Sequence, residues 1–393
     1  MSETAIERMR AAFHDGTLLH PLDGDGNTVD LAQALSSLAG APVEPCDRAR
    51  ELRDEIGAQE HYVVVIVDGL GMNLVERLPV DAFLRRHLIR ELRAVYPSST
   101  APGLTSLATA AWPGEHAVLG WWLYLPDAGV TSTILPYVER FSNRPLEQLR
   151  VPPSYAFPRV ARPTQFTYHV RTFMPAPIAG STYTRYSSGD APYYGYGDLR
   201  DAVEHIARRI RGATGPTYNY WYIPHVDAAE HTWGVGSPQT WSALQQAQAC
   251  IAELASQLRA RARIVVTADH GQIDVGQRHI IDRDDELAAL IAIPPTGDPR
   301  SPLLHARDTT ALRACFARGY ENYALLSIDE AEELRLFGPV ALSDEARRRA
   351  GDFVAVAFDD SAIFYEPDAS LRAMVGVHGG LSPSELRIPL VVA

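Results

Sequence analysis

The chain contains no lysine, so all 36 of its basic residues are arginines. This absence excludes chemistry that needs a lysine amine, namely Schiff-base formation and the phosphate-binding lysine of a P-loop. Cysteine is also scarce, and Cys46, Cys250 and Cys315 lie far apart without a C-x-x-C spacing. Neither a disulfide framework nor a structural zinc site is indicated, and we interpret these cysteines as small buried apolar residues.

Long apolar segments are missing as well. The first residues include acidic side chains and no apolar stretch of signal-peptide length, and no run of about 18 apolar residues occurs later. We therefore expect a cytoplasmic protein without a membrane partner. The formal net charge of −12 argues against a nucleic-acid partner, because such proteins need a basic surface. The sequence gives no indication of the oligomeric state.

The composition is that of an ordinary globular protein, with 46% hydrophobic and 21% charged residues. Apolar segments at 62–67, 217–224 and 263–268 lack the alternation of a half-exposed strand, which is typical of strands buried on both faces of a parallel sheet. Helical segments at 198–212 and 237–259 separate them. We therefore predict an α/β fold with a mainly parallel central sheet flanked by helices.

The chain divides unevenly along its length. We expect residues 1–60 to form a lead-in packed on the core and residues 61–393 to form the catalytic domain. Residues 121–187 are rich in aromatic residues, prolines and short strand-like pieces, which is typical of a small cap inserted over a site. A smaller insertion is expected at about 275–375, and residues 74–92 favour a helix with a break at Pro79.

Carboxylates and imidazoles follow the predicted strands, in loops that converge at one edge of a parallel sheet. Any one of them alone is more often a helix cap or a surface residue, but their joint placement indicates a metal site. Carboxylates and imidazoles without thiolates are ligands for zinc or manganese, and two such ions about 4 Å apart can clamp a displacement at phosphorus. The candidate ligands are Asp68, Asp227, His231, Asp269, His270 and His378.

Residues 96–116, YPSSTAPGLTSLATAAWPGEH, place the hydroxyl of Thr100 at the predicted start of a helix. Pro97 and two serines precede Thr100, and small helix-compatible residues follow it. A side chain at a helix N-terminus lies among free amide donors, at the positive end of the helix dipole. This environment suits a hydroxyl that becomes an oxyanion. For this segment alone, a simple helix cap made by Ser98, Ser99 and Thr100 is the alternative.

The order and spacing of these motifs resemble the alkaline phosphatase superfamily, most closely its type I phosphodiesterase/nucleotide pyrophosphatase branch. The resemblance extends from residue 62 to the C-terminus. It rests on DGLG at 68–71, PSSTAPG at 97–103, WPGEH at 112–116, DAAEH at 227–231, ADHG at 268–271 and VHGG at 377–380.

The resemblance implies a hydrolase of small-molecule phosphoesters that uses two divalent metal ions, zinc or alternatively manganese. Thr100 would be the nucleophile and would form a covalent phospho-threonine intermediate that water then hydrolyses. The resemblance also divides the ligands between the two ions. One ion would be held by Asp68, Thr100, Asp269 and His270, and the other by Asp227, His231 and His378.

One position departs from the family pattern. The nucleotide pyrophosphatases have an asparagine shortly after the WPGEH-like segment that contacts a phosphoryl oxygen, and this chain has Trp121 there, followed by Trp122. Both tryptophans are candidate substrate-binding residues, with packing in the core or cap as the alternative. Arg140, Arg144 or an arginine of residues 171–185 could supply the lost contact, although for most of them a solvated surface position is the favoured alternative.

Four other functions stay open, one of them metal-dependent phosphoryl transfer to an acceptor other than water, while a sulfatase is disfavoured. A sulfatase needs a cysteine or serine followed by an arginine, and residues 100–104 read TAPGL. A phosphomonoesterase or a phosphonoacetate hydrolase-like C–P hydrolase could use the same site. A non-catalytic binding module that contains metal is the alternative from another class, although the complete ligand set argues against it.

Overall fold

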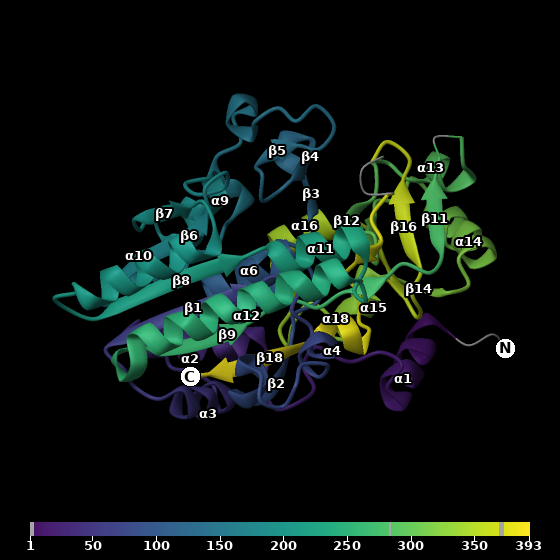
Figure 1. Cartoon of the computed structure of the whole chain (residues 1–393). Coiled ribbons are helices and arrows are strands. Elements are labelled where there is room, and N and C mark those ends of the chain that lie inside the picture. The colour runs from purple at the N-terminus through teal and green to yellow at the C-terminus, as the bar shows by residue number, and fades with distance from the viewer. Residues whose placement is uncertain (1–3, 283, 369–372) are drawn as a thin grey trace.

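The computed structural model describes residues 4–282, 284–368 and 373–393. Within these residues the central sheet has the strand order β2-β18-β9-β1-β8-β6-β7 (Figure 1). From β9 to β7 neighbouring strands pair in parallel, whereas β18 is antiparallel to both β9 and β2. The predicted α/β class and mainly parallel sheet are therefore confirmed. The strands are β2 (Leu88–Arg93), β18 (Arg387–Val392), β9 (Arg263–Thr267), β1 (His61–Val67), β8 (Thr217–Ile223), β6 (His169–Pro175) and β7 (Tyr193–Tyr196).

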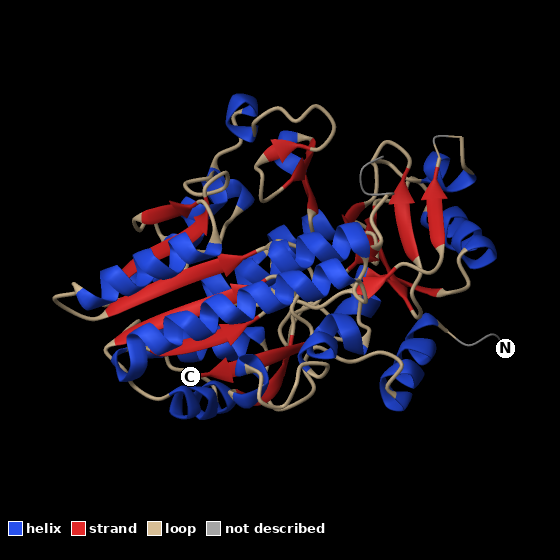
Figure 2. Cartoon of the chain, in the orientation of Figure 1, coloured by secondary structure: helices blue, strands red, loops and turns tan. Residues whose placement is uncertain are grey.

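Helices cover both faces of this sheet, which explains why every residue of β1 is buried (Figure 2). On one face lie α10 (Leu199–Arg211), α11 (His225–Trp233) and the long α12 (Pro238–Leu258), and α12 contacts both of the other two helices. On the other face α2 (Thr28–Leu38) packs against α3 (Asp47–Ile56) and α6 (Thr100–Thr109). The continuous apolar character of β1 follows from this double coverage.

A second, largely antiparallel sheet has the order β14-β15-β13-β12-β3-β4-β5 within the described residues. It joins two parts of the chain that the sequence analysis treated as separate insertions, because β3 and β12 pair at Trp122 and Gly297. The strands are β14 (Tyr323–Ser327), β15 (Phe353–Ala357), β13 (Ser301–Leu304), β12 (Thr296–Asp298), β3 (Trp122–Leu125), β4 (Val130–Thr133) and β5 (Val138–Glu139).

Two segments differ from their predicted place or type. Residues 169–175, assigned to the cap, form β6 inside the central sheet, paired with β8. Residues 74–92 do not form the predicted helix, because the chain makes short helices α4 (Met72–Val75) and α5 (Phe83–Arg86) and then enters β2. The pairing of β2 with the distant β18 outweighs the local helix preference of this segment. The division into lead-in, catalytic domain and insertions stays a prediction.

The remaining elements lie around these two sheets. None of the helices in the described part of the chain combines the length and the apolar character needed to cross a membrane. The other strands are β10 (Ile273–Asp274), β11 (Arg278–Ile281), β16 (Ala362–Tyr365) and β17 (Gly376–Val377). The other α-helices are α1 (Ala5–Asp15), α7 (Pro113–His116), α8 (Pro153–Ala156), α9 (Thr182–Ser188), α13 (Glu286–Leu290), α14 (Thr309–Gly319), α15 (Ile328–Glu333), α16 (Asp344–Ala350) and α18 (Pro383–Leu386).

Candidate active site

The carboxyl ends of the central strands open into a cleft of about 730 Å³. Asp68 follows β1 directly, and Asp269 and His270 follow β9. Asp227 lies in the first turn of α11, just after β8, and its partner His231 lies one turn later on the same helix. His378 comes from the loop after β17, and Thr100 is the first residue of α6. The structure thus brings all of the predicted ligands and the predicted nucleophile together.

Asp68, Asp269 and His270 form a fully buried group beneath Thr100. Their ligand atoms lie within 4.8 Å of one another. The Nε2 atom of His270 is 3.3 Å from Oδ1 of Asp68 and 3.7 Å from Oδ2 of Asp269. The same nitrogen is 3.1 Å from the Thr100 hydroxyl oxygen. The Thr100 hydroxyl is therefore in direct contact with a member of this group.

A second group surrounds Asp227, which lines the cleft together with His231 and His378. Its Oδ1 atom is 3.3 Å from Nε2 of His231 and 3.7 Å from Nε2 of His378. Donor atoms of Asp227, His270 and His378 also lie within 4.8 Å of one another. His270 therefore borders both groups, and the assignment of each ligand to one of two ions stays a prediction.

The unpaired atoms of these groups fit bound cations. Among the described residues, Oδ1 of Asp68 and Oδ2 of Asp269 are buried and have no hydrogen-bond partner. Buried carboxylate oxygens without partners are costly unless a cation binds them. His231 and His270 each contact a backbone carbonyl through Nδ1, at 2.8 Å and 3.1 Å. This contact directs Nε2 toward the carboxylates, as in metal-bound histidines.

The protein alone does not stabilise the charges of this site. Burial raises the pKa of Asp68 well above its ordinary value, and the neighbouring carboxylates of Asp227 and Asp269 raise it further. Burial also raises the pKa of Asp269. Burial and the nearby imidazoles of His270 and His231 lower the pKa of His378 well below its ordinary value. Positive charge between the carboxylates would reverse the shifts of both aspartates, which again fits bound cations.

The start of α6 lies directly against Asp269. A Cβ atom added at Gly103 would come within 2.9 Å of the Asp269 Cβ atom, so only glycine allows this approach. Ser99 is the N-cap residue of α6, yet its side chain makes no capping hydrogen bond. In the alternative of a simple helix cap made by Ser98, Ser99 and Thr100, Ser99 is thus the N-cap by position, but its hydroxyl does not cap the helix. That hydroxyl donates instead to Oδ1 of Asp298, at 2.8 Å.

Three further candidate residues of the site were not predicted from the sequence. The Tyr222 hydroxyl donates a hydrogen bond to Oδ2 of Asp68, and the Gln272 amide donates one to Oδ1 of Asp227. Tyr222 and Gln272 lie close in sequence to motif residues at strand ends. This position could have identified them as candidate residues of the site. Asp298 lines the cleft at the end of β12 and is distant in sequence from every motif. Burial raises the pKa of its carboxyl group to about 7. No sequence signal marked Asp298.

Both tryptophans line the cleft. The Trp121 backbone amide donates to Oδ2 of Asp298 at 3.3 Å. Trp122 lies under the guanidinium of Arg140, whose carbon is 3.7 Å from the ring centroid, and Arg140 pairs with Asp368. Among the described residues that line the cleft, none is an arginine. The possible replacement of the lost asparagine contact by Arg140, Arg144 or an arginine of residues 171–185 therefore gains no support from the described lining.

A parallel sheet with this site at its carboxyl edge and a hydroxyl at a helix start defines an alkaline phosphatase-like fold. The family model for type I phosphodiesterase/nucleotide pyrophosphatase matches residues 62–381. The chain belongs to this family, which identifies it as a phosphoester hydrolase. Among curated proteins, no match to the chain was found.

Solved structures of two kinds share the fold. Murine ectonucleotide pyrophosphatase/phosphodiesterase 5 superposes with a TM-score of 0.64 at 17% identity, over 84% of this chain and 87% of that chain. Phosphonoacetate hydrolase from Sinorhizobium meliloti 1021, solved with phosphonoformate, superposes with a TM-score of 0.60 at 18% identity, over 84% of this chain and 89% of that chain. Both are similar in fold to this protein.

Proposed function

We propose that the protein is a metal-dependent phosphodiesterase that acts through Thr100. The observation that carries this proposal is the position of the Thr100 hydroxyl, 3.1 Å from His270 Nε2 at the start of α6, above carboxylate oxygens that have no partner. In the murine relative, a variant with alanine in place of a threonine is inactive and was solved with AMP. That variant supports a threonine nucleophile in this fold.

The residues present would hold two divalent cations, and we propose zinc, with manganese as the alternative. The ligands would be Asp68, Asp269 and His270, with Thr100, for one ion, and Asp227, His231 and His378 for the other. Bound there, the cations would supply Lewis-acid stabilisation of charge on the phosphoryl group and lower the pKa of a coordinated hydroxyl.

Residues of the protein supply the nucleophile and the donors to the phosphoryl oxygens. The Thr100 oxygen attacks phosphorus and gives its proton to water, the bond from phosphorus to the leaving alcohol breaks, and the leaving alcoholate takes up a proton from water, so that no net proton is gained or lost in this step. The backbone amides of Thr100 and Ala101 lie in the first turn of α6, where such groups have no partner within the helix. They would donate to the phosphoryl oxygens as charge develops. Water then cleaves the phospho-threonine and restores the hydroxyl.

Cleavage of bis(4-nitrophenyl) phosphate tests this proposal. We expect turnover that EDTA abolishes and that added zinc or manganese restores, with about two ions per chain. Thr100→Ala should abolish turnover and keep most of the metal, whereas near-normal turnover of this variant would remove Thr100 from the nucleophile role. A protein that binds metal but cleaves no phosphoester would instead be the binding module.

A C–P hydrolase is the second candidate, because the phosphonoacetate hydrolase shares the fold. Phosphonoacetate carries a carboxylate besides its phosphonate, and the described lining of the cleft offers no arginine to bind it. The diester reaction is therefore the better supported of the two. Release of phosphate from phosphonoacetate, measured in parallel, distinguishes them.

A further inference from the structure

The walls of the cleft are apolar well beyond the metal-ligating residues. Apart from the ligands and Asp298, most of the lining consists of aromatic, aliphatic and proline side chains. They come from three directions: the second sheet, the end of β6 and the loop before β17. Those that define the walls are Trp121, Trp122, Leu135, Met174, Ile178 and Met374.

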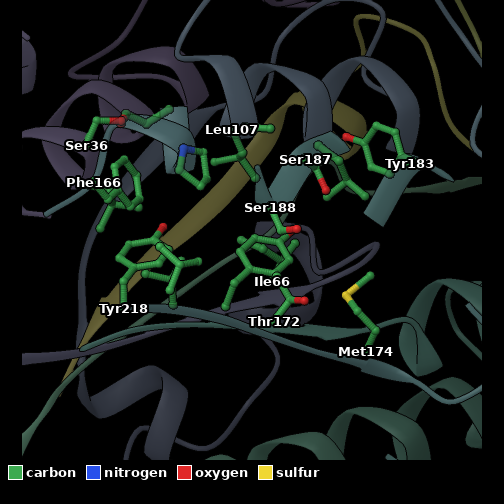
Figure 3. A pocket seen from close by; sticks show the side chains of 18 residues that line it. Ser36, Ile66, Leu107, Phe166, Thr172, Met174, Tyr183, Ser187, Ser188 and Tyr218 are labelled. Atoms are coloured by element: carbon green, nitrogen blue, oxygen red, sulfur yellow. The ribbon is translucent and has the colours of Figure 1, made fainter. Parts of the chain in front are cut away.

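The apolar character continues behind one wall of the cleft. Leu104, Met174 and Tyr183 line both the cleft and a small inner cavity of about 40 Å³. In Figure 3 side chains such as Ile66 and Phe166 surround this inner space, with Met174 at one end. The shared wall itself is therefore mainly apolar, whereas the inner cavity also has the hydroxyl side chains of Ser36, Thr172, Ser187 and Ser188 in its lining.

Apart from its imidazoles, the acidic and basic side chains in the described lining of the cleft are all carboxyl groups. Asp68, Asp227 and Asp298 line it, the described lining contains no arginine, and the chain has no lysine. Asp298 accepts the amide of Trp121, so a carboxylate lies behind the position where the family resemblance implies an amide donor. Among the described residues of the lining, a second anionic group on a substrate would lose its water without gaining a basic side chain as a partner.

From this lining we infer that the enzyme selects phosphodiesters whose non-leaving alcohol is apolar and uncharged, and rejects substrates that carry a second anionic group. The inference rests on the proposed function, because it concerns the substrate of the same site. It sets this cleft apart from one built for phosphonoacetate or for a nucleotide with further phosphates.

Three esters with the same 4-nitrophenolate leaving group test the inference. They are the 4-nitrophenyl diesters of methanol, phenol and 4-hydroxybenzoate, so that the second adds an apolar ring and the third adds a carboxylate to that ring. We expect kcat/KM for the phenyl ester to exceed both other values by at least about 10-fold. A carboxyphenyl ester cleaved as well as the phenyl ester would overturn the inference.

A charge placed in the wall gives a second readout. Ile178 lines the cleft and is 39% exposed, so Ile178→Arg adds a cation without burying it. We expect this variant to raise kcat/KM for the carboxyphenyl ester relative to the phenyl ester by at least about 5-fold. Ile89, which is 42% exposed on β2, does not line the cleft, and Ile89→Arg should leave the ratio unchanged.

The outcomes separate this inference from the proposed function. If none of the three esters is cleaved by the metal-loaded protein, the phosphodiesterase proposal fails. If all three are cleaved at similar rates, or if Ile178→Arg does not change the ratio, the phosphodiesterase proposal stands and the inference about its substrate fails.

Discussion

The Ser99 hydroxyl donates a hydrogen bond to the Asp298 carboxylate over 2.8 Å, across 199 positions of sequence. Asp298 is 2% exposed and also accepts the amide of Trp121. The Asp298 carboxylate is thus hydrogen-bonded both to Ser99, the residue before Thr100, and to the backbone of Trp121 in the cleft wall. The start of α6 is therefore positioned by the second sheet as well as by the central one.

Removing this link should misplace Thr100 without emptying the metal sites. We expect Asp298→Ala and Ser99→Ala each to lower kcat by roughly 10- to 100-fold, because a small displacement of a nucleophile is costly. The double variant should lose little more than the worse single variant, since both remove the same hydrogen bond. Kinetics together with metal content measure this. Strictly additive losses would show that the two residues act independently.

Gly103 should be intolerant of a single methyl group. In Gly103→Ala the new Cβ atom would meet Asp269 at 2.9 Å, so α6 or the carboxylate must shift. We expect at least about 10-fold loss of kcat/KM. Gly319 ends α14 with nothing within 4 Å of the added atom, and Gly319→Ala is the matched control with unchanged activity. Equal activity of the two variants would contradict this close approach.

Tyr222 should increase metal affinity through Asp68. Its hydroxyl donates to Oδ2 of Asp68, so Tyr222→Phe leaves that ligand without its orienting partner. We expect metal affinity to fall by roughly 10- to 100-fold, measured by competition with a chelator. Tyr137→Phe is the control, because it removes a buried hydroxyl that donates to a backbone carbonyl, at 2.8 Å. If both variants bind metal equally, Tyr222 is only a packing residue.

His116 should make stability depend on pH. It is fully buried between Ser106 and the amide of Val118, and burial lowers its pKa to about 3 from 6.5. Between these values the unfolded chain binds the proton and the folded chain does not, so stability falls as the pH falls. The contribution is about 1.4 kcal/mol per pH unit below pH about 6.5.

Urea unfolding of the wild type and His116→Asn between pH 4.5 and 7.5 measures this contribution. Every other titrating group is common to both proteins, so the difference between their free energies of unfolding isolates His116. We expect the wild type to lose stability faster on acidification, with the two slopes equal above pH about 7. Parallel curves over the whole range would show that His116 titrates alike in both states.

Local patterns in the sequence were sufficient for β1, β8 and β9 and for the position of the candidate site, but they did not place β2 and β6 in the central sheet. The continuous apolar sequence of strands such as β1 is enough to predict that they are buried on both faces. The candidate ligands follow these strands in the sequence, at the edge of the sheet where parallel strands end. The second sheet was not predictable in this way, because its β3 and β12 are joined by a long-range pairing at Trp122 and Gly297. The role of Asp298 depends on that pairing and had no local signal either.

The strands of the second sheet are far apart in the sequence, so the ribosome completes this sheet late. Its first strands lie near residue 122, but β15, which joins β13 to β14, ends only at Ala357. The strand β3, which begins at Trp122, can therefore pair early with β4 but lacks its other neighbour β12, and the strands beyond β12, until most of the chain has left the ribosome. A nascent chain that already contains Thr100 and five of the six candidate metal ligands still has an unfinished cleft.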